Sequence, residues 1–286
     1  MILPDSAARY ADMGGFPLVA ARMVEKGIFD SPLNVLPLQS AYWSVAPRYY
    51  RYLSTEVDNY PRDVDPFQIA WVDPSAITRF TKREYPFWVD IKHQFGTVRD
   101  GDWDIRNETP IDRTYDGTPP KLYLADRFEE TVLHQSLQER FSNGTPWDET
   151  EFVEIAQQIV AEGGTVWNHC RTEAEIATAC NHVDQLYESM QQRGCLPYRH
   201  VLKEQDALQI DFLQCLKGEI VVDIGRDGNL LFVDGRHRLS IAKLLGLERV
   251  PIIVLVRHEQ WMRSQDPGVT GQIPGHPDHP GDLTDQ

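Results

Sequence analysis

The pattern of hydrophobic and polar positions is clearest in the last third of the chain. Two apolar runs in "EIVVDIGRDGNLLFVDG" (219–235) flank Arg226-Asp227-Gly228, and this pattern predicts a β-hairpin. Residues 236–245 then repeat apolar positions at helical spacing, and "VPIIVLV" (250–256) predicts a fully buried strand. Because strand, helix and apolar strand follow one another, we expect a crossover unit with a right-handed connection.

Weaker patterns predict the other elements. "PFQIAWVDPSAI" (66–77) predicts a short strand that ends at Asp73-Pro74, because proline cannot continue a strand ladder. Three amphipathic helices are expected at 127–141, 146–162 and 172–194.

Polar residues mark the expected starts of the first two of these helices. Asp126 and Glu129 form a capping-box pattern, and Thr145 followed by Pro146 is typical of a helix cap and first position. Two short amphipathic helices need a partner surface. We therefore expect them to form a lid or buttress beside the turn at 234–238.

Together these elements predict an α+β fold with a small mixed sheet and helices packed on it. In the helix at 236–245 we expect Leu239, Ala242 and Leu245 to face the sheet, because positions three apart share one side of a helix. The expected strands of the sheet are 220–224, 230–233 and 250–256.

The chain divides into three expected parts. Residues 1–66 form an aromatic-rich N-terminal segment, for which packing on the main core is the first interpretation and protein binding the second. Residues 67–258 form the main domain, interrupted by a long helical insertion at 78–170. Residues 259–286 are expected to be a flexible tail rich in Gly and Pro.

Composition and charge narrow the possible functions. The net charge is −15, and Asp exceeds Glu (25 against 18) while Arg exceeds Lys (21 against 7). An acidic surface poor in Lys is typical of a halophilic protein, and the alternative is a soluble acidic protein kept apart by self-repulsion. Without a global basic face, general nucleic-acid binding is unlikely to be the function, so no nucleic-acid partner is expected.

Neither a membrane span nor a secretory signal is predicted. No run approaches the roughly 18 apolar residues of a membrane helix. The start "MILPDSAARYADMGG" lacks a basic region followed by an apolar stretch. We therefore expect a cytoplasmic protein. Its cysteines lack Cys-x-x-Cys spacing and are expected to be buried small hydrophobic residues; they are Cys170, Cys180, Cys195 and Cys215.

The segment Asp234-Gly235-Arg236-His237-Arg238 carries the strongest candidate chemistry. A helix that starts after Gly235 directs unpaired N–H groups and the positive end of its dipole at the strand tip. Gly235 lets a ligand approach the backbone, and Arg236 and Arg238 supply fork-shaped donors for phosphate oxygens. His237 can donate a hydrogen bond or transfer a proton.

This pattern predicts a phosphate-binding site. Asp234 would accept from a hydroxyl, hold a metal ion or orient an arginine. The alternative is that Asp234 caps the helix while the cations lie in water or pair with nearby acids.

A second candidate site is "RDGDWD" (99–104). Asp102 and Asp104 lie on either side of Trp103, and alternate residues of an extended segment face the same side. Paired carboxylates bind Mg²⁺ alongside phosphates. The alternative is an acidic surface turn with Trp103 in the core.

The motif at 234–238, followed by "LSIAKLLGLERVPIIV" (239–254), resembles the signature of the ParB/sulfiredoxin-like fold. Members of this family carry a Gly-rich turn with His-Arg or Arg-Arg at a helix start, where nucleotide phosphates bind. "IAWVDPSAI" (69–77) is similar to the opening strand of that fold, and "LYESMQQRGCLPYRHVL" (186–202) to the segment before its hairpin. The resemblance implies a nucleotide-binding domain with ATP or CTP as ligand.

Departures from the family signature separate its members. In sulfiredoxins the turn contains a catalytic cysteine, and Arg236 stands in its place here, so reductase chemistry is not expected. ParB proteins carry a helix-turn-helix reader after this fold, where this chain has its Gly/Pro-rich tail. Free-serine kinases have a similar motif and a catalytic carboxylate after the first strand; here Thr81 aligns with that carboxylate, and Glu84 follows three residues on.

The resemblance and the residues together predict a nucleotide-dependent phosphotransferase or nucleotide hydrolase that acts on a small hydroxylated substrate. Phosphates would lie on Gly235–Arg238 with His237 handling protons, and a carboxylate would activate the attacking oxygen or hold Mg²⁺. The candidate carboxylates are Glu84, Asp102, Asp104 and Asp234. The alternatives are a non-catalytic nucleotide-sensing module with a protein partner and, less favoured, a ParB-like DNA-binding protein or nuclease.

Overall fold

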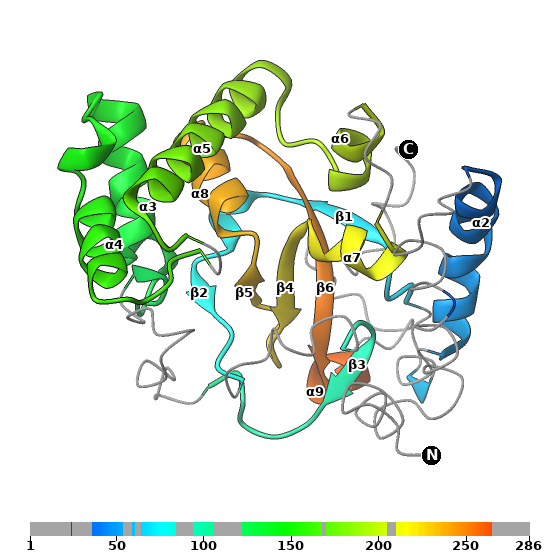
Figure 1. Cartoon of the computed structure of the whole chain (residues 1–286). Helices are drawn as coiled ribbons and strands as arrows, with labels where there is room; N and C mark the ends of the chain where they lie inside the picture. The colour runs from blue at the N-terminus through cyan, green and yellow to red at the C-terminus, as the bar shows by residue number, and fades with distance from the viewer. Residues whose placement is uncertain are drawn as a thin grey trace, which may run out of the picture.

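A computed structural model shows an α+β fold, with helices on both faces of a mixed sheet (Figure 1). The predicted fold class is confirmed. The structure describes residues 24, 36–53, 59–60, 64–83, 94–105, 122–167, 170–204 and 210–264.

The sheet has the strand order β1-β6-β4-β5-β2, and β3 pairs with β6 beside this path. β4 runs antiparallel to β5 and parallel to β6, while β1 runs antiparallel to β6. The strands are β1 (Ile69–Val72), β2 (Arg79–Phe80), β3 (Thr97–Arg99), β4 (Ile220–Ile224), β5 (Leu230–Asp234) and β6 (Val250–His258).

The central strands are buried on both faces, because their side chains alternate between two hydrophobic clusters. In β4, Ile220 and Val222 pack into one cluster and Val221 into the other. β5 divides in the same way, with Phe232 on the first face and Val233 on the second. The sheet is therefore the middle layer of the molecule.

Helices cover both faces of this layer (Figure 1). α8, α3, α4 and α5 contribute to the first cluster, and α2, α6 and α7 to the second. The α-helices are α2 (Leu36–Leu53), α3 (Val132–Gln138), α4 (Glu151–Ala161), α5 (Glu173–Arg193), α6 (Tyr198–Glu204), α7 (Phe212–Lys217), α8 (Arg236–Leu244) and α9 (Glu259–Ser264). Short turns of other helix types are η2 (Pro74–Ala76), η5 (Phe128–Glu130), η6 (Glu139–Asn143) and η7 (Trp147–Glu149).

The elements with the strongest hydrophobic pattern agree with prediction. β4, β5, β6 and α8 lie at the expected positions, and α5 spans Glu173–Arg193 with Gly194 at its end. Leu239 and Ala242 are fully buried and Leu245 packs half-buried against the same cluster. The expected face of α8 is therefore confirmed.

Two other expectations from composition also agree. The four cysteines are buried and free. In α2, Trp43 and Tyr50 pack against Phe212 of α7, at ring-centroid distances of 5.9 Å each. The aromatic cluster of the N-terminal segment thus belongs to the core.

The expected direct crossover from 230–233 to 250–256 is wrong. β5 and β6 both pair with β4 and are not neighbours. The parallel pair is β4 and β6, so the connection between parallel strands consists of β5 and α8 together. The hairpin places the antiparallel strand β5 between β4 and the helix in the chain. The local sequence pattern does not show which of these strands become neighbours in the sheet.

The expected helical insertion at 78–170 also supplies strands. β2 pairs parallel with β5, and β3 pairs parallel with β6. Both strands are only two or three residues long, too short to show a periodic pattern. Residues 259–264, expected to belong to a flexible tail, form α9 instead, and Trp261 and Met262 are buried in the core. The rest of the expected tail, 265–286, lies outside the described residues.

Two expected helix starts are wrong. Thr131, not Asp126, caps α3, with its Oγ1 accepting from His134 N at 3.3 Å. The second helix starts at Glu151, because the stretch after Pro146 forms the short turn η7 instead.

Within the residues described, no helix is long and apolar enough to cross a membrane.

Candidate functional site

The residues from Asp234 to Arg238 line a cavity of about 330 Å³ at the start of α8. Its other walls come from distant parts of the chain. They are Val233 of β5, Lys217 at the end of α7, Leu186 of α5, and Tyr123 and Trp167 on either side of α3 and α4. Residues that flank α3 and α4 therefore reach the turn, whereas the described lining contains no residue of the two helices themselves. The expectation that these helices form a lid or buttress stays a prediction.

Gly235 allows the tight turn from β5 into α8. Its φ is 89°, in the left-handed region, and an added Cβ would lie 2.9 Å from both Glu219 O and Ile220 Cα. The reason for glycine here is thus the close approach of β4, rather than the approach of a ligand. Asp234 Oδ1 accepts from Gly235 N at 2.8 Å and does not cap the helix.

The first turn of α8 leaves three backbone donors unpaired. The first bond into the helix runs from Leu239 N to Gly235 O at 3.0 Å. The N–H groups of Arg236, His237 and Arg238 have no partner among the described residues. Together with the helix dipole they form a local positive field at the cavity.

Two cations at this cavity add to that field. The Arg236 guanidinium lies over the ring of Tyr123, 4.3 Å from its centroid. Neither Arg236 nor Lys217 forms an ion pair with any described residue. The described lining contains one carboxylate, Asp234. The cavity is therefore suited to an anion.

His237 is a neutral side chain in this cavity. Its Nε2 is buried without a hydrogen-bond partner, and its ring lies 5.7 Å from that of Trp167. Burial and, second, the charge of Arg236 lower the pKa of His237 to about 3. An anion at this place would supply the missing partner for Nε2.

Trp167 holds its position with a strained backbone. Its φ is 54°, the one positive value among the described residues other than glycine. Its indole stacks on Phe152 of α4 at 4.8 Å. Such strain persists only where the surroundings enforce it, and it is concentrated at functional sites.

Arg238 has a structural role. It donates through Nη1 to Gly218 O and Glu219 Oε2, both at 2.8 Å, and through Nη2 to Leu196 O at 2.5 Å and Cys195 Sγ at 3.3 Å. Four of its five N–H groups are thus occupied. The expectation that Arg238 grips phosphate is not supported by this arrangement, in which it pairs with a nearby acid.

Glu219, the partner of Arg238, is 1% exposed. Its other oxygen accepts from Tyr198 N at 2.6 Å. Burial raises the pKa of the Glu219 carboxyl, and the charge of Arg238 opposes this rise. The pair therefore connects the segment before α6 and the start of β4 to the first turn of α8.

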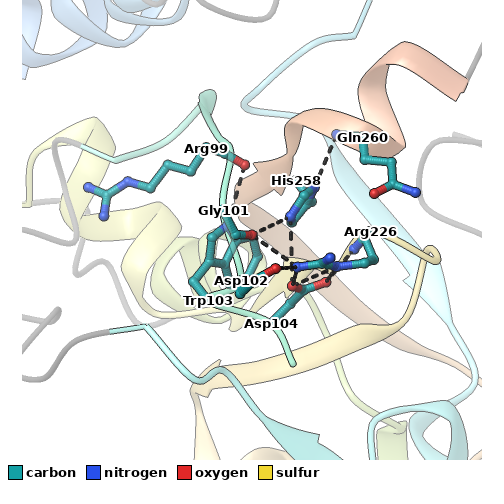
Figure 2. A network of polar contacts seen from close by, with 8 residues as sticks. All are labelled: Arg99, Gly101, Asp102, Trp103, Asp104, Arg226, His258 and Gln260. Carbon is teal, nitrogen blue, oxygen red and sulfur yellow. Dashed lines mark hydrogen bonds and ion pairs between the residues drawn. The ribbon is translucent and has the colours of Figure 1, made fainter. Parts of the chain in front are cut away.

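Asp102 and Asp104, the expected Mg²⁺ ligands, are held by an arginine (Figure 2). Arg226 Nη2 donates to both carboxylates at 2.8 Å, and Arg226 N donates to Asp104 Oδ2 at 2.7 Å. Burial would raise the pKa of Asp104, but the bonds from Arg226 lower it below the usual value. Both carboxylates therefore already share one cationic partner within the protein.

His258 completes this network (Figure 2). Its Nε2 lies 2.8 Å from Gly101 O, and its Nδ1 accepts from Gln260 N at 3.0 Å. The Trp103 indole is buried and stacks on the His258 ring at 5.5 Å. The interpretation of an acidic turn with Trp103 in the core fits this arrangement.

The two candidate sites do not meet. Arg226 lies in the turn before β5 and Gly235 directly after it. Five strand residues separate the two ends by roughly 16 Å. Asp102 and Asp104 therefore cannot hold a metal ion against a phosphate at the start of α8.

The remaining candidate carboxylate is Glu84, which was aligned near Thr81. Glu84 lies outside the described residues. Thr81 is buried beside β5, with Thr81 N donating to Phe232 O at 2.9 Å. In the part of the chain that is described, no group of three or more His, Cys, Asp or Glu could hold a metal ion.

The aromatic and charged residues of the cavity that sequence reasoning missed are Tyr123, Trp167 and Lys217. Tyr123 and Trp167 are isolated aromatic residues in stretches without a periodic pattern. Lys217 lies three positions before Ile220, where the first hairpin strand begins, and lysine at this position is a signal in a chain that has few lysines.

No family model, curated protein or solved structure matches this chain. The resemblance to the ParB/sulfiredoxin-like fold therefore stays a prediction.

Proposed function

We propose that the cavity at the start of α8 binds the phosphate groups of a nucleotide, ATP or CTP. One observation carries this proposal: three N–H groups, two cations and the Nε2 of His237 border one cavity, and none of them has a hydrogen-bond or ion-pair partner among the described residues. Helix N-termini with such donors are anion sites. The aromatic rings of Tyr123 and Trp167 offer apolar wall to the rest of the ligand.

The reaction that this site supports best is phosphotransfer to a small hydroxylated substrate, or hydrolysis of the nucleotide. Asp234 is the carboxylate in place to accept a proton from the attacking oxygen. Mg²⁺ in such sites needs one or two carboxylates plus phosphate oxygens, so Asp234 alone is compatible with it. His237, neutral before the ligand binds, would donate to a phosphate oxygen.

A nucleotide sensor without turnover is the second candidate. It is favoured by the low number of carboxylates: the described lining contains Asp234 alone, and Asp234 Oδ1 already accepts from Gly235 N. Incubation with γ-labelled ATP or CTP, Mg²⁺ and a pool of small hydroxylated metabolites separates the two. Release or transfer of label supports the enzyme, and binding without either supports the sensor.

The binding proposal itself is tested by calorimetry with Arg236→Ala. Loss of one charge-assisted phosphate contact should weaken nucleotide binding roughly ten- to a hundredfold. Arg236→Lys should recover part of it, because a point charge does not reproduce the planar fork. Arg249→Ala, an exposed arginine beyond the end of α8, is the matched control and should bind as the wild type does. Equal affinity of the wild type and Arg236→Ala would overturn the proposal.

A further inference from the structure

The second half of α8 borders another cavity. It measures about 740 Å³ and lies between the turn after β1, the segment of η5 and α3, and the stretch from Ala242 to Glu248. Its volume is within the range of roughly 300–1,000 Å³ that is typical of small-molecule sites. It shares no lining residue with the cavity at the start of the helix.

His134 of α3 lines this cavity with one buried nitrogen that lacks a partner. The residue is 5% exposed, and its Nδ1 is buried without a partner. Its contacts are a ring contact with Phe128 at 5.7 Å and a bond from its backbone N to Thr131 Oγ1. No described residue bonds either ring nitrogen.

Glu129 lines the same cavity with one unsatisfied oxygen. Its Oε1 accepts from Lys243 Nζ at 2.6 Å, and its Oε2 is buried without a partner. Buried polar atoms without partners are rare in native structures, and each one calls for an explanation. Here two lie on side chains of one cavity wall.

The protonation states of both groups follow from their surroundings. Burial lowers the pKa of His134, which keeps its ring neutral, with one donor and one acceptor nitrogen. Burial would raise the pKa of Glu129, but Lys243 lowers it overall, so the carboxylate is ionised and only accepts. The missing partners are therefore a donor for Glu129 Oε2 and a group that can donate to or accept from His134 Nδ1.

The charge around the cavity favours a cation. The Glu129–Lys243 pair is neutral as a whole. Asp73 and Glu248 remain at the rim, together with the negative end of the α8 dipole, and Arg127 opposes them. Ser75, Thr78 and Gln138 add further groups that bond hydroxyls.

We propose that this cavity binds a small polyhydroxylated amine, whose ammonium group donates to Glu129 Oε2 and whose hydroxyl groups bond the ring nitrogens of His134. This site is independent of the nucleotide site proposed above. A bound amine of this kind supplies every partner that the two side chains lack.

The probes are D-glucosamine and D-glucose, which differ by an ammonium group in place of one hydroxyl. Each is titrated calorimetrically into the full chain. Saturable binding of glucosamine, at least tenfold tighter than that of glucose, is the expected result, because a charge-assisted bond to the carboxylate is lost with glucose. Equal binding of the two sugars, or no saturable binding of glucosamine, would overturn the proposal and leave water as the partner of the buried atoms.

Two variants locate the binding. Glu129→Gln removes the charge, and His134→Phe keeps the ring volume but removes both nitrogens; each should weaken glucosamine binding about tenfold or more. Glu130→Gln makes the same chemical change at the next, exposed position and should leave the affinity unchanged. If the two site variants bind like the wild type, the proposal is wrong.

A measurement on the wild type covers the case in which these variants do not fold. Glucosamine should shift the ring ¹⁵N resonances of His134, while those of His182, exposed on α5, stay in place. Binding without any shift at His134 would also contradict the site.

Discussion

The two ends of β5 look alike in the sequence and differ in the structure. Each carries a glycine turn, an arginine and nearby carboxylates. At the start of the strand, the guanidinium of Arg226 and the carboxylate of Asp104 satisfy each other, and His258 has partners for both ring nitrogens. At its other end, the contact of the Arg236 guanidinium within the described residues is with the face of the Tyr123 ring. The N–H groups of the first turn of α8 have no partners in the described chain.

This difference distinguishes polar groups that stabilise the fold from polar groups that are available to bind a ligand. Polar groups that have found partners within the protein contribute to the fold, and their loss leaves other buried groups unpaired. Groups held near one another without partners contribute little to the fold and are available to a ligand. Arg238 shows that one turn can contain both kinds, because it lies two residues from Arg236 and is almost fully bonded.

The largest effect is expected for Arg238→Ala. Removing this guanidinium leaves Glu219 buried and without its counter-charge, which should lower the free energy of unfolding by about 3–5 kcal/mol. Urea denaturation measures the change. The double variant Arg238→Met with Glu219→Gln should recover part of the loss, because it removes both charges. A fully stable Arg238→Ala protein that had lost only nucleotide affinity would show that Arg238 belongs to the binding groups.

The next largest effect is expected for Arg226→Ala at the other end of β5. It removes the side-chain donors to Asp104, whose side chain is 4% exposed, and should lower the free energy of unfolding by about 1–3 kcal/mol. The control is Arg263→Ala, which breaks a solvent-screened pair with Glu259 and should change the free energy of unfolding much less. Both are compared by urea midpoint. If the two variants had equal midpoints, the network in Figure 2 would not be a structural one.

A smaller effect is expected on the pH dependence of the free energy of unfolding. The pKa of His237 is lowered to about 3 in the folded protein, so below pH 6.5 the unfolded chain takes up a proton that the folded chain does not. Stability from this group is therefore full above about pH 6.5 and falls as the pH is lowered, by up to about 2 kcal/mol at pH 5. Denaturation of His237→Phe at pH 7 and pH 5 should lack this component.

His182→Gln, at an exposed position of α5, is the control for that experiment and should keep the pH dependence of the wild type. A His237→Phe variant with the same loss between pH 7 and pH 5 would mean that His237 is protonated equally in the folded and unfolded chains.

The smallest effect on stability is expected for Arg236→Ala. This side chain gives up only its contact with the Tyr123 ring, so the free energy of unfolding should change by less than about 1 kcal/mol. Thermal melts of the ligand-free variant and wild type provide the measurement. A loss comparable to that of Arg238→Ala would remove the contrast between paired and unpaired arginines.

The local sequence determined the central elements of this protein. Alternating or continuous apolar residues located β4, β5 and β6, and the helical repeat located α8 and its buried face at Leu239 and Ala242. Glycine between β5 and α8 predicted the turn, because few other residues adopt its backbone angles. These features depend on neighbours within a few positions, and so they are visible in the chain itself.

The tertiary structure alone decided which polar residues are free. Arg226 meets Asp104 across 122 positions of sequence, and Arg238 meets Leu196 across 42. Tyr123 and Trp167 reach the start of α8 because α3 packs against α8 and α4 packs against α3. The sequence shows which side chains can pair. Whether a charged group has a partner depends on which residues the folded chain brings within about 3 Å of it, and these residues are distant in sequence.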